Sequence, residues 1–104
     1  MPEFLFSYHG GTTPETPEDA EKEMAAWGAW FESMGDAVVI PGNPVGKSHT
    51  VTRDAVADNG GANPVSGYTV VKTDTKDGAI ELAKGCPMVQ DGSGSIEVAE
   101  IHQL

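Results

Sequence analysis

Five short stretches rich in aromatic or β-branched residues are typical of β-strands, with apolar positions that recur at strand spacing. Between the third and the fourth, residues 54–66 carry Gly, Asn, Asp and Pro without any period, which predicts a loop or a loose hairpin. The five predicted strands are EFLFSYH (3–9), DAVVI (36–40), HTVTR (49–53), GYTVVKT (67–73) and SIEVAEI (95–101).

A helix is predicted at residues 17–34. Thr16 can cap it, Pro17 suits the first helical position and Gly35 suits its end. Four residues at helical spacing predict the stripe that faces the core, and Trp30 departs from this stripe by about 60–100°. Trp30 is therefore expected at the edge of a pocket or at a dimer interface. The stripe consists of Met24, Trp27, Phe31 and Met34.

A second helix is predicted from Asp74 or Thr75 to about Lys84. Gly85 is expected to end it, and Pro87 prevents its continuation. The side chains expected to face inward are Ala79, Ile80 and Ala83.

The order of elements, β-α-β-(β)-β-α-β, predicts a ferredoxin-like α+β sandwich. Crossover helices of this kind join strands that run parallel within one sheet, and both helices then cover a single face. Because strand side chains alternate between faces, six apolar strand residues are not expected to face the helices together. Apolar side chains on the open face predict a partner, most simply a second copy of the chain. The six are Phe4, Phe6, Tyr8, Val70, Ile96 and Val98.

The length of 104 residues suits one domain that spans residues 1–104. Lys and Arg number 6 against 16 Asp and Glu, and the formal net charge of −10 disfavours nucleic acid and anionic membranes as partners. The N-terminal region does not resemble a signal peptide, and no stretch approaches the length of a membrane span. One cysteine excludes an intrachain disulfide. A cytoplasmic location is expected.

Four stretches, in this order and spacing, resemble the YCII-related family, which includes proteins with a DGPF motif. The resemblance implies a dimeric α+β barrel, that is, a homodimer with a cleft between sheet and helices. It implies only loosely an enzyme-like or ligand-binding role. In place of the DGPF motif this chain has Asp58-Asn59-Gly60-Gly61, so a function tied to that motif is not implied. The stretches are FLFSYHG, MAAWGAWFESMGDAVVIPGNPV, GYTVVKTDTKDGAIELAKGCP and GSGSIEVAEI.

The segment VVIPGNPVGKSHT (38–50) is similar at first sight to a phosphate-binding loop. Three residues separate Gly42 from Gly46, whereas the motif requires four. The residues after Ser48 also have strand character, although the motif should open a helix there. A glycine–proline connection between two strands is the better interpretation.

Three histidines are candidates for acid–base chemistry, because only histidine titrates near neutral pH without help from its surroundings. His9 ends the first strand and His49 begins the third, so both are predicted to border the cleft as catalytic residues. His102 is expected on the surface. The histidines lack the spacing of metal ligands, and neither a metal site nor a cofactor is predicted. For Cys86, which no basic residue is placed to activate, a structural role is expected.

Two classes of function follow from these observations. The first is a homodimeric small-molecule-binding protein or cofactor-independent enzyme, in which His9 transfers a proton on a small organic acid. Tyr8 and Trp27 would bound its cleft, and Asn43 or Tyr68 would orient the ligand. The alternative is a non-catalytic dimeric interaction or regulatory module. An enclosed pocket that holds both histidines would favour chemistry.

Overall fold

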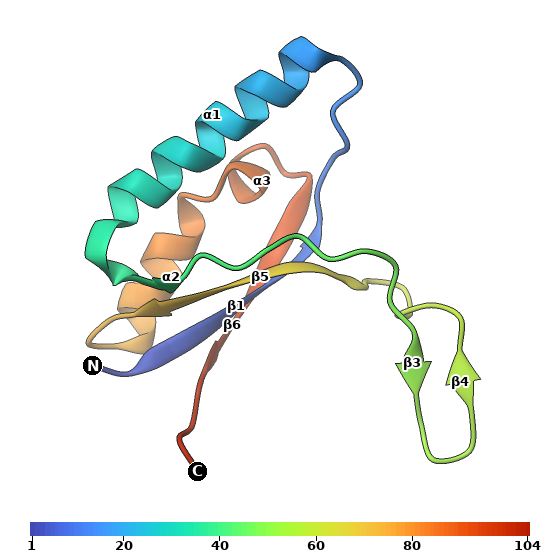
Figure 1. The fold of residues 1–104 in the computed structure, drawn as a ribbon. Helices are drawn as coiled ribbons and strands as arrows, with labels where there is room; N and C mark the ends of the chain where they lie inside the picture. Colours follow the sequence, from blue (N-terminus) through green and yellow to red (C-terminus); the bar gives the residue numbers. More distant parts are fainter.

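The chain folds into a four-stranded sheet with its helices on one face, and a small hairpin extends from the sheet (Figure 1). The computed structural model describes residues 1–104. The sheet contains β1 (Glu3–Gly10), β2 (Val38–Ile40), β5 (Val65–Lys72) and β6 (Gly94–Glu100), and the hairpin contains β3 (Thr50–Val51) and β4 (Val56–Ala57). The helices are α1 (Pro17–Met34), α2 (Lys76–Lys84) and α3 (Pro87–Gln90), and a 3₁₀ turn, η1 (Gly35–Ala37), follows α1.

The strand order in the sheet is β2-β5-β1-β6, and every neighbouring pair is antiparallel. β1 and β2 run parallel with β5 between them, and β5 and β6 run parallel with β1 between them. Each helical crossover therefore joins two parallel strands and skips the strand that separates them. This is the ferredoxin-like α+β sandwich that the order of elements predicts.

Side-chain caps determine where the two longer helices begin, as predicted. Thr16 Oγ1 accepts a hydrogen bond from the backbone N–H of Asp19 at 3.1 Å. Thr75 Oγ1 accepts one from the N–H of Gly78 at 3.0 Å. Each bond satisfies an N–H that has no partner within its own helix. No helix of the chain combines the length and the apolar character that crossing a membrane requires.

Two local features were not predicted. Pro87 occupies the first position of α3, where a proline loses no helical hydrogen bond, so it begins a helix as well as ending one. The predicted strand at 36–40 begins only at Val38, because η1 takes up the residues directly after α1.

The core lies between the helices and one face of the sheet. Five of the six apolar strand residues face the helices and the sixth does not, so the expectation that all six could not do so together is confirmed. Three of them alternate along β1, and β6 pairs with β1 so that Ile96 lies directly opposite Tyr8. Only Val70, which pairs with Leu5, lies on the open face. The five are Phe4, Phe6, Tyr8, Ile96 and Val98.

Trp30 anchors α1 in the core, which corrects its predicted place at a pocket edge or dimer interface. Trp30 is 6% exposed, whereas Met24 of the predicted stripe is 75% exposed. The indole N–H of Trp30 donates to the carbonyl oxygen of Leu82 at 2.9 Å, and its ring stacks on Phe6. These partners turn α1 so that Trp30 points inward. On α2, Ala79 and Ala83 are buried as predicted, but Ile80 is 36% exposed.

The hairpin stands apart from the main sheet, because β3 and β4 pair only with each other (Figure 1). Val51 lies opposite Val56, and both side chains are exposed. Residues 54–66 were predicted to form a loop or a loose hairpin; β4 lies within this range but pairs with β3 of the predicted third strand, and residues 58–64 form a loop. After Ser48 the chain enters β3 and no helix begins there, so the segment 38–50 lacks the structure of a phosphate-binding loop.

Candidate functional site

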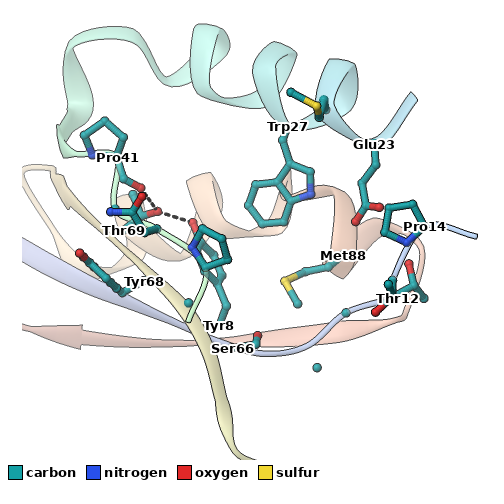
Figure 2. Close-up of a pocket in the computed structure, with 18 of the residues that line it drawn as sticks. Tyr8, Thr12, Pro14, Glu23, Trp27, Pro41, Ser66, Tyr68, Thr69 and Met88 are labelled. Atoms are coloured by element: carbon teal, nitrogen blue, oxygen red, sulfur yellow. Dashed lines mark hydrogen bonds between the residues drawn. The ribbon is translucent and has the colours of Figure 1, made fainter. Parts of the chain in front are cut away.

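A pocket of about 800 Å³ opens between α1 and the sheet (Figure 2). Tyr8 of β1 lies on the sheet side of the pocket and Trp27 of α1 covers the opposite side. Two stretches complete the walls: residues 10–14, which follow β1, and residues 41–44, which run beside β5. The apolar lining also includes Met24, Phe31 and Met88.

The wall at residues 41–44 continues the edge of the sheet beyond β2 (Figure 1). The backbone N–H of Tyr68 donates to the carbonyl oxygen of Asn43 at 3.2 Å. Pro44 and Gly67 form an isolated antiparallel bridge. These contacts hold the glycine–proline segment along β5, so the wall is fixed by the sheet.

Gly42 allows this close approach of two backbones. Its φ is +76°, and a Cβ at this position would lie 1.7 Å from the carbonyl oxygen of Tyr68. Both the left-handed conformation and the lack of space exclude a side chain here. The glycine that first indicated a phosphate-binding loop is thus required by the packing of the pocket wall.

The aromatic side chains that meet at the pocket hold one another in place. Tyr8 and Trp27 pack edge to face, with ring centroids 5.3 Å apart and an interplanar angle of 88°. Trp27 also packs edge to face on Trp30, at 5.5 Å and 77°, and Trp30 is anchored in the core. Trp27 therefore offers the pocket an aromatic surface whose orientation is fixed by its neighbours.

A short chain of hydrogen bonds crosses one side of the pocket (Figure 2). The hydroxyl of Tyr8 lies 2.6 Å from Thr69 Oγ1, and Thr69 Oγ1 donates to the carbonyl oxygen of Pro41 at 2.8 Å. Burial raises the pKa of Tyr8 well above its ordinary value, so the phenol stays protonated at neutral pH. The chain joins β1, β5 and the wall segment through side-chain hydroxyl groups.

The pocket contains little charge. Glu23 is the one carboxylate among its lining residues, which include no histidine, lysine or arginine. No three His, Cys, Asp or Glu side chains of the chain lie close enough together to hold a metal ion. Stacking and neutral hydrogen bonds are therefore the interactions that this pocket offers a ligand.

His9 lies outside the pocket. It follows Tyr8 directly in β1, so its side chain points to the opposite face of the sheet. There its Nδ1 lies 2.9 Å from the carbonyl oxygen of Asn63. Its Nε2 lies 2.9 Å from a carboxylate oxygen of Glu97 and 3.1 Å from Ser7 Oγ. The side chain is buried on this second face and does not approach Trp27.

His49 lies on the hairpin, also outside the pocket. Its Nε2 is 2.8 Å from Asp58, and Lys47 Nζ is 3.2 Å from the same carboxylate. Both interactions lie at the exposed surface. The pocket holding both histidines, which was expected to favour acid–base chemistry, is therefore absent.

All four residues predicted to contact a ligand line the pocket: Tyr8, Trp27, Asn43 and Tyr68. Tyr68 pairs with Ser7, so its side chain belongs to the open face of the sheet and its backbone bonds to the wall segment. Their contact with a ligand remains a prediction.

The sequence interpretation missed Thr69, Met88 and Glu23, which also line the pocket. Thr69 could have been found by alternation, because it lies on the same face of β5 as Gly67, the residue opposite Tyr8. Met88 lies on α3, which was not predicted, and Glu23 is one acidic residue among several in α1. No local signal distinguishes these last two.

Cys86 is fully buried and belongs to the core. Burial raises the pKa of its thiol to about 11, so it is protonated at neutral pH and a poor nucleophile. This agrees with the structural role expected of it.

No protein-family model matches the chain, and no curated protein matches it. Among solved structures it is similar to the 5-chloro-2-hydroxyhydroquinone dehydrochlorinase TftG from Burkholderia phenoliruptrix AC1100, in complex with 2,5-dihydroxybenzoquinone. The identity is 13% and the TM-score 0.57, over 100% of this chain and 94% of the other. At this identity the match shows a shared fold, in agreement with the ferredoxin-like α+β class predicted from the sequence.

Proposed function

We propose that this protein binds a small cyclic organic molecule in the pocket between α1 and the sheet. The observation that carries the proposal is Trp27, which is held edge-on by Tyr8 and Trp30 and presents a fixed aromatic surface to the pocket. A volume of about 800 Å³ and an apolar lining with a few hydroxyl and amide groups are typical of sites for small organic ligands.

The comparison with solved structures supports the class of ligand. The similar dehydrochlorinase is bound to 2,5-dihydroxybenzoquinone, a planar ring that would fit beside an indole. At 13% identity this likeness concerns the fold, so the ligand of the present chain is inferred from its own pocket. We also propose membership of the YCII-related family and a single domain over residues 1–104.

Acid–base catalysis by His9 is a separate hypothesis from binding in the pocket. A substrate of His9 would have to lie on the open face of the sheet, beside Ser7 and Glu97. A substrate stacked on Trp27 would lie on the other side of β1. The position of the pocket thus favours a binding role, and any chemistry of His9 would take place on the open face of the sheet.

We further propose that the chain forms a homodimer through the open face of the sheet. Ile40 and Tyr68 are 49% and 37% exposed there, and Val70 lies between Ile40 and Leu5 on the same face. No helix covers this face (Figure 1). Static light scattering after size exclusion should give the mass of two chains. Ile40→Asp should shift the mass towards one chain, because it places a charge in the interface.

Binding can be tested by calorimetric titration and thermal shift with phenols, quinones and cyclic carboxylic acids. A ligand of the native pocket stabilises the folded protein by RT ln(1 + [L]/Kd), so the unfolding temperature rises with the ligand concentration. Trp27→Leu should weaken binding about tenfold or more by removing the stacking surface. Val51→Ala, on the distant hairpin, serves as the matched control.

The outcomes separate the two classes of function. Equal affinity in the wild type and in Trp27→Leu would place the ligand elsewhere and contradict the proposal. A stable dimer that binds no member of the panel would favour the alternative, a non-catalytic dimeric interaction or regulatory module.

A further inference from the structure

We propose that the pocket selects rings that carry a hydroxyl group, and that Thr69 is the positioning residue that sets this preference through Tyr8. The proposal rests on the proposed binding function and names its class of ligand: hydroxylated aromatic molecules. It follows from where the two protons of the Tyr8–Thr69–Pro41 chain must lie.

The direction of this chain is fixed at its Pro41 end. A carbonyl oxygen can only accept, so Thr69 gives its single hydroxyl proton to Pro41, across 2.8 Å. The oxygen of Thr69 then has only lone pairs left for Tyr8, which lies 2.6 Å away. Tyr8 must therefore donate its own proton to Thr69.

Tyr8 lines the pocket, so the lone pairs of its hydroxyl oxygen are a hydrogen-bond acceptor that it can offer a ligand there. Its proton is directed at Thr69, and Thr69 is fully buried, so the arrangement is held inside the protein (Figure 2). Thr69 is the single hydrogen-bond partner of the Tyr8 hydroxyl. A phenolic ligand can donate to the free lone pairs of Tyr8.

A ligand without a donor is at a disadvantage at this position. An ether, carbonyl or carboxylate oxygen would meet the Tyr8 oxygen as a second acceptor, and the ligand oxygen would then have no hydrogen-bond partner at Tyr8. Sites built around one polar group discriminate in this way because the mismatched complex leaves a polar group unpaired. Thr69 does not need to touch the ligand for this effect, since it acts by holding the Tyr8 proton.

Two substitutions of Thr69 separate this role from simple packing. Thr69→Val has nearly the same shape but cannot accept the proton of Tyr8, which is then free to turn towards the pocket. Thr69→Ser retains a hydroxyl that can donate to Pro41 and accept from Tyr8. Tyr8→Phe removes the acceptor itself. It is the reference protein, in which the pocket cannot use this acceptor to distinguish a ligand with a hydroxyl donor from one without.

The experiment compares 2-naphthol with 2-methoxynaphthalene, which differ in the presence of a donor, by calorimetric titration of each protein. The quantity of interest is the ratio of the two affinities, because differences in apolar transfer cancel when ratios are compared between variants. We expect the wild-type ratio to exceed that of Tyr8→Phe about tenfold, or about 1.4 kcal/mol, in favour of the naphthol. Thr69→Ser should retain this preference, and Thr69→Val should lose most of it.

An equal ratio in the wild type and Tyr8→Phe, with both probes bound, would overturn the inference but leave the proposed function intact. Preference for the naphthol that persists in Thr69→Val would also overturn the role of Thr69. Failure of both probes to bind the wild type would contradict the proposed function together with the inference. If Thr69→Val does not fold, the comparison of the wild type with Tyr8→Phe and Thr69→Ser still tests whether the Tyr8 oxygen causes the preference for the naphthol.

Discussion

Replacing Trp30 by phenylalanine tests whether this residue, which the helical pattern placed off the core-facing stripe, anchors α1. Trp30 is 6% exposed, and its indole N–H donates to the carbonyl oxygen of Leu82 at 2.9 Å. Its ring stacks on Phe6, with centroids 6.3 Å apart. The substitution keeps an aromatic ring but removes the donor and part of the buried surface.

The cost has two parts. The carbonyl oxygen of Leu82 also accepts from the N–H of Gly85 at 3.2 Å, so loss of the indole does not leave it without a partner. The hydrogen-bond part is therefore about 1 kcal/mol, and not the larger cost of an unsatisfied group. The space left by the smaller ring adds about 1 kcal/mol. We expect about 2 kcal/mol in total, or a fall in the unfolding midpoint of roughly 10 °C.

Urea denaturation followed by far-ultraviolet circular dichroism is the appropriate assay, because the substitution removes a tryptophan fluorophore. All variants are compared at one chain concentration, since a dimer would make stability depend on it. Trp27→Phe is the matched control: Trp27 is only partly buried and packs at the pocket, so its loss should cost under about 1 kcal/mol. If Trp27→Phe destabilises the protein as much as Trp30→Phe, the assignment of Trp30 as the anchor is wrong.

Three further predictions concern single residues. The pKa of Cys86 is 9.0 ordinarily and about 11 in the fold, so the folded state binds the proton more tightly and stability should fall by roughly 2 kcal/mol as the pH rises through this interval. Cys86→Ala should flatten that slope in urea titrations, and a slope of the opposite sign would refute the assignment. Gly42→Ala should cost at least about 2 kcal/mol in urea denaturation, because its Cβ meets the Tyr68 carbonyl oxygen; a cost near zero would contradict the wall geometry. His9→Ala should leave the affinity for 2-naphthol within about twofold by calorimetry, because His9 and Tyr8 point to opposite faces; loss of binding would place His9 in the site.

The fold could be predicted from the sequence where the signals are local. Thr16 and Thr75 cap the helices through bonds to residues three positions away, so the starts of α1 and α2 can be predicted from residues that are close in the sequence. The order of strands and helices then leaves few topologies, and the ferredoxin-like sheet is the one observed. Local signals and topology rules were sufficient for this part.

The orientation of α1 could not be predicted in the same way. Its apolar residues are spread around more than one side, so helical spacing permits several stripes. The choice is made by the carbonyl oxygen of Leu82, which lies 52 residues further along the chain and bonds to Trp30. Such a contact exists only once α2 is packed, and no local pattern contains it.

Part of the candidate site was accessible to sequence reasoning, and part was misjudged. Tyr8, Trp27 and Asn43 do come together, because β1, α1 and the wall segment are adjacent in this topology. His9 was expected in the same cleft as Tyr8, although consecutive strand residues point to opposite faces. Alternation along β1 is by itself sufficient to separate these two residues, because it depends only on their being neighbours in one strand.

The open face of β1 nevertheless has a defined chemistry of its own. A serine–histidine–carboxylate catalytic triad requires the serine and the carboxylate at opposite ring nitrogens. Here Ser7 and Glu97 both approach Nε2 of His9, at 3.1 and 2.9 Å, and Nδ1 is taken by the carbonyl oxygen of Asn63. His9 therefore cannot be oriented by Glu97 while it activates Ser7.

The same contacts determine where the protons of His9 lie. The carbonyl oxygen of Asn63 can only accept, so Nδ1 carries a proton. The other ring nitrogen, Nε2, lies 2.9 Å from the carboxylate oxygen of Glu97, so both ring nitrogens have partners on the open face. A molecule that contacts His9 would therefore lie on the open face, on the other side of β1 from the ligand that Trp27 and Tyr8 are proposed to bind.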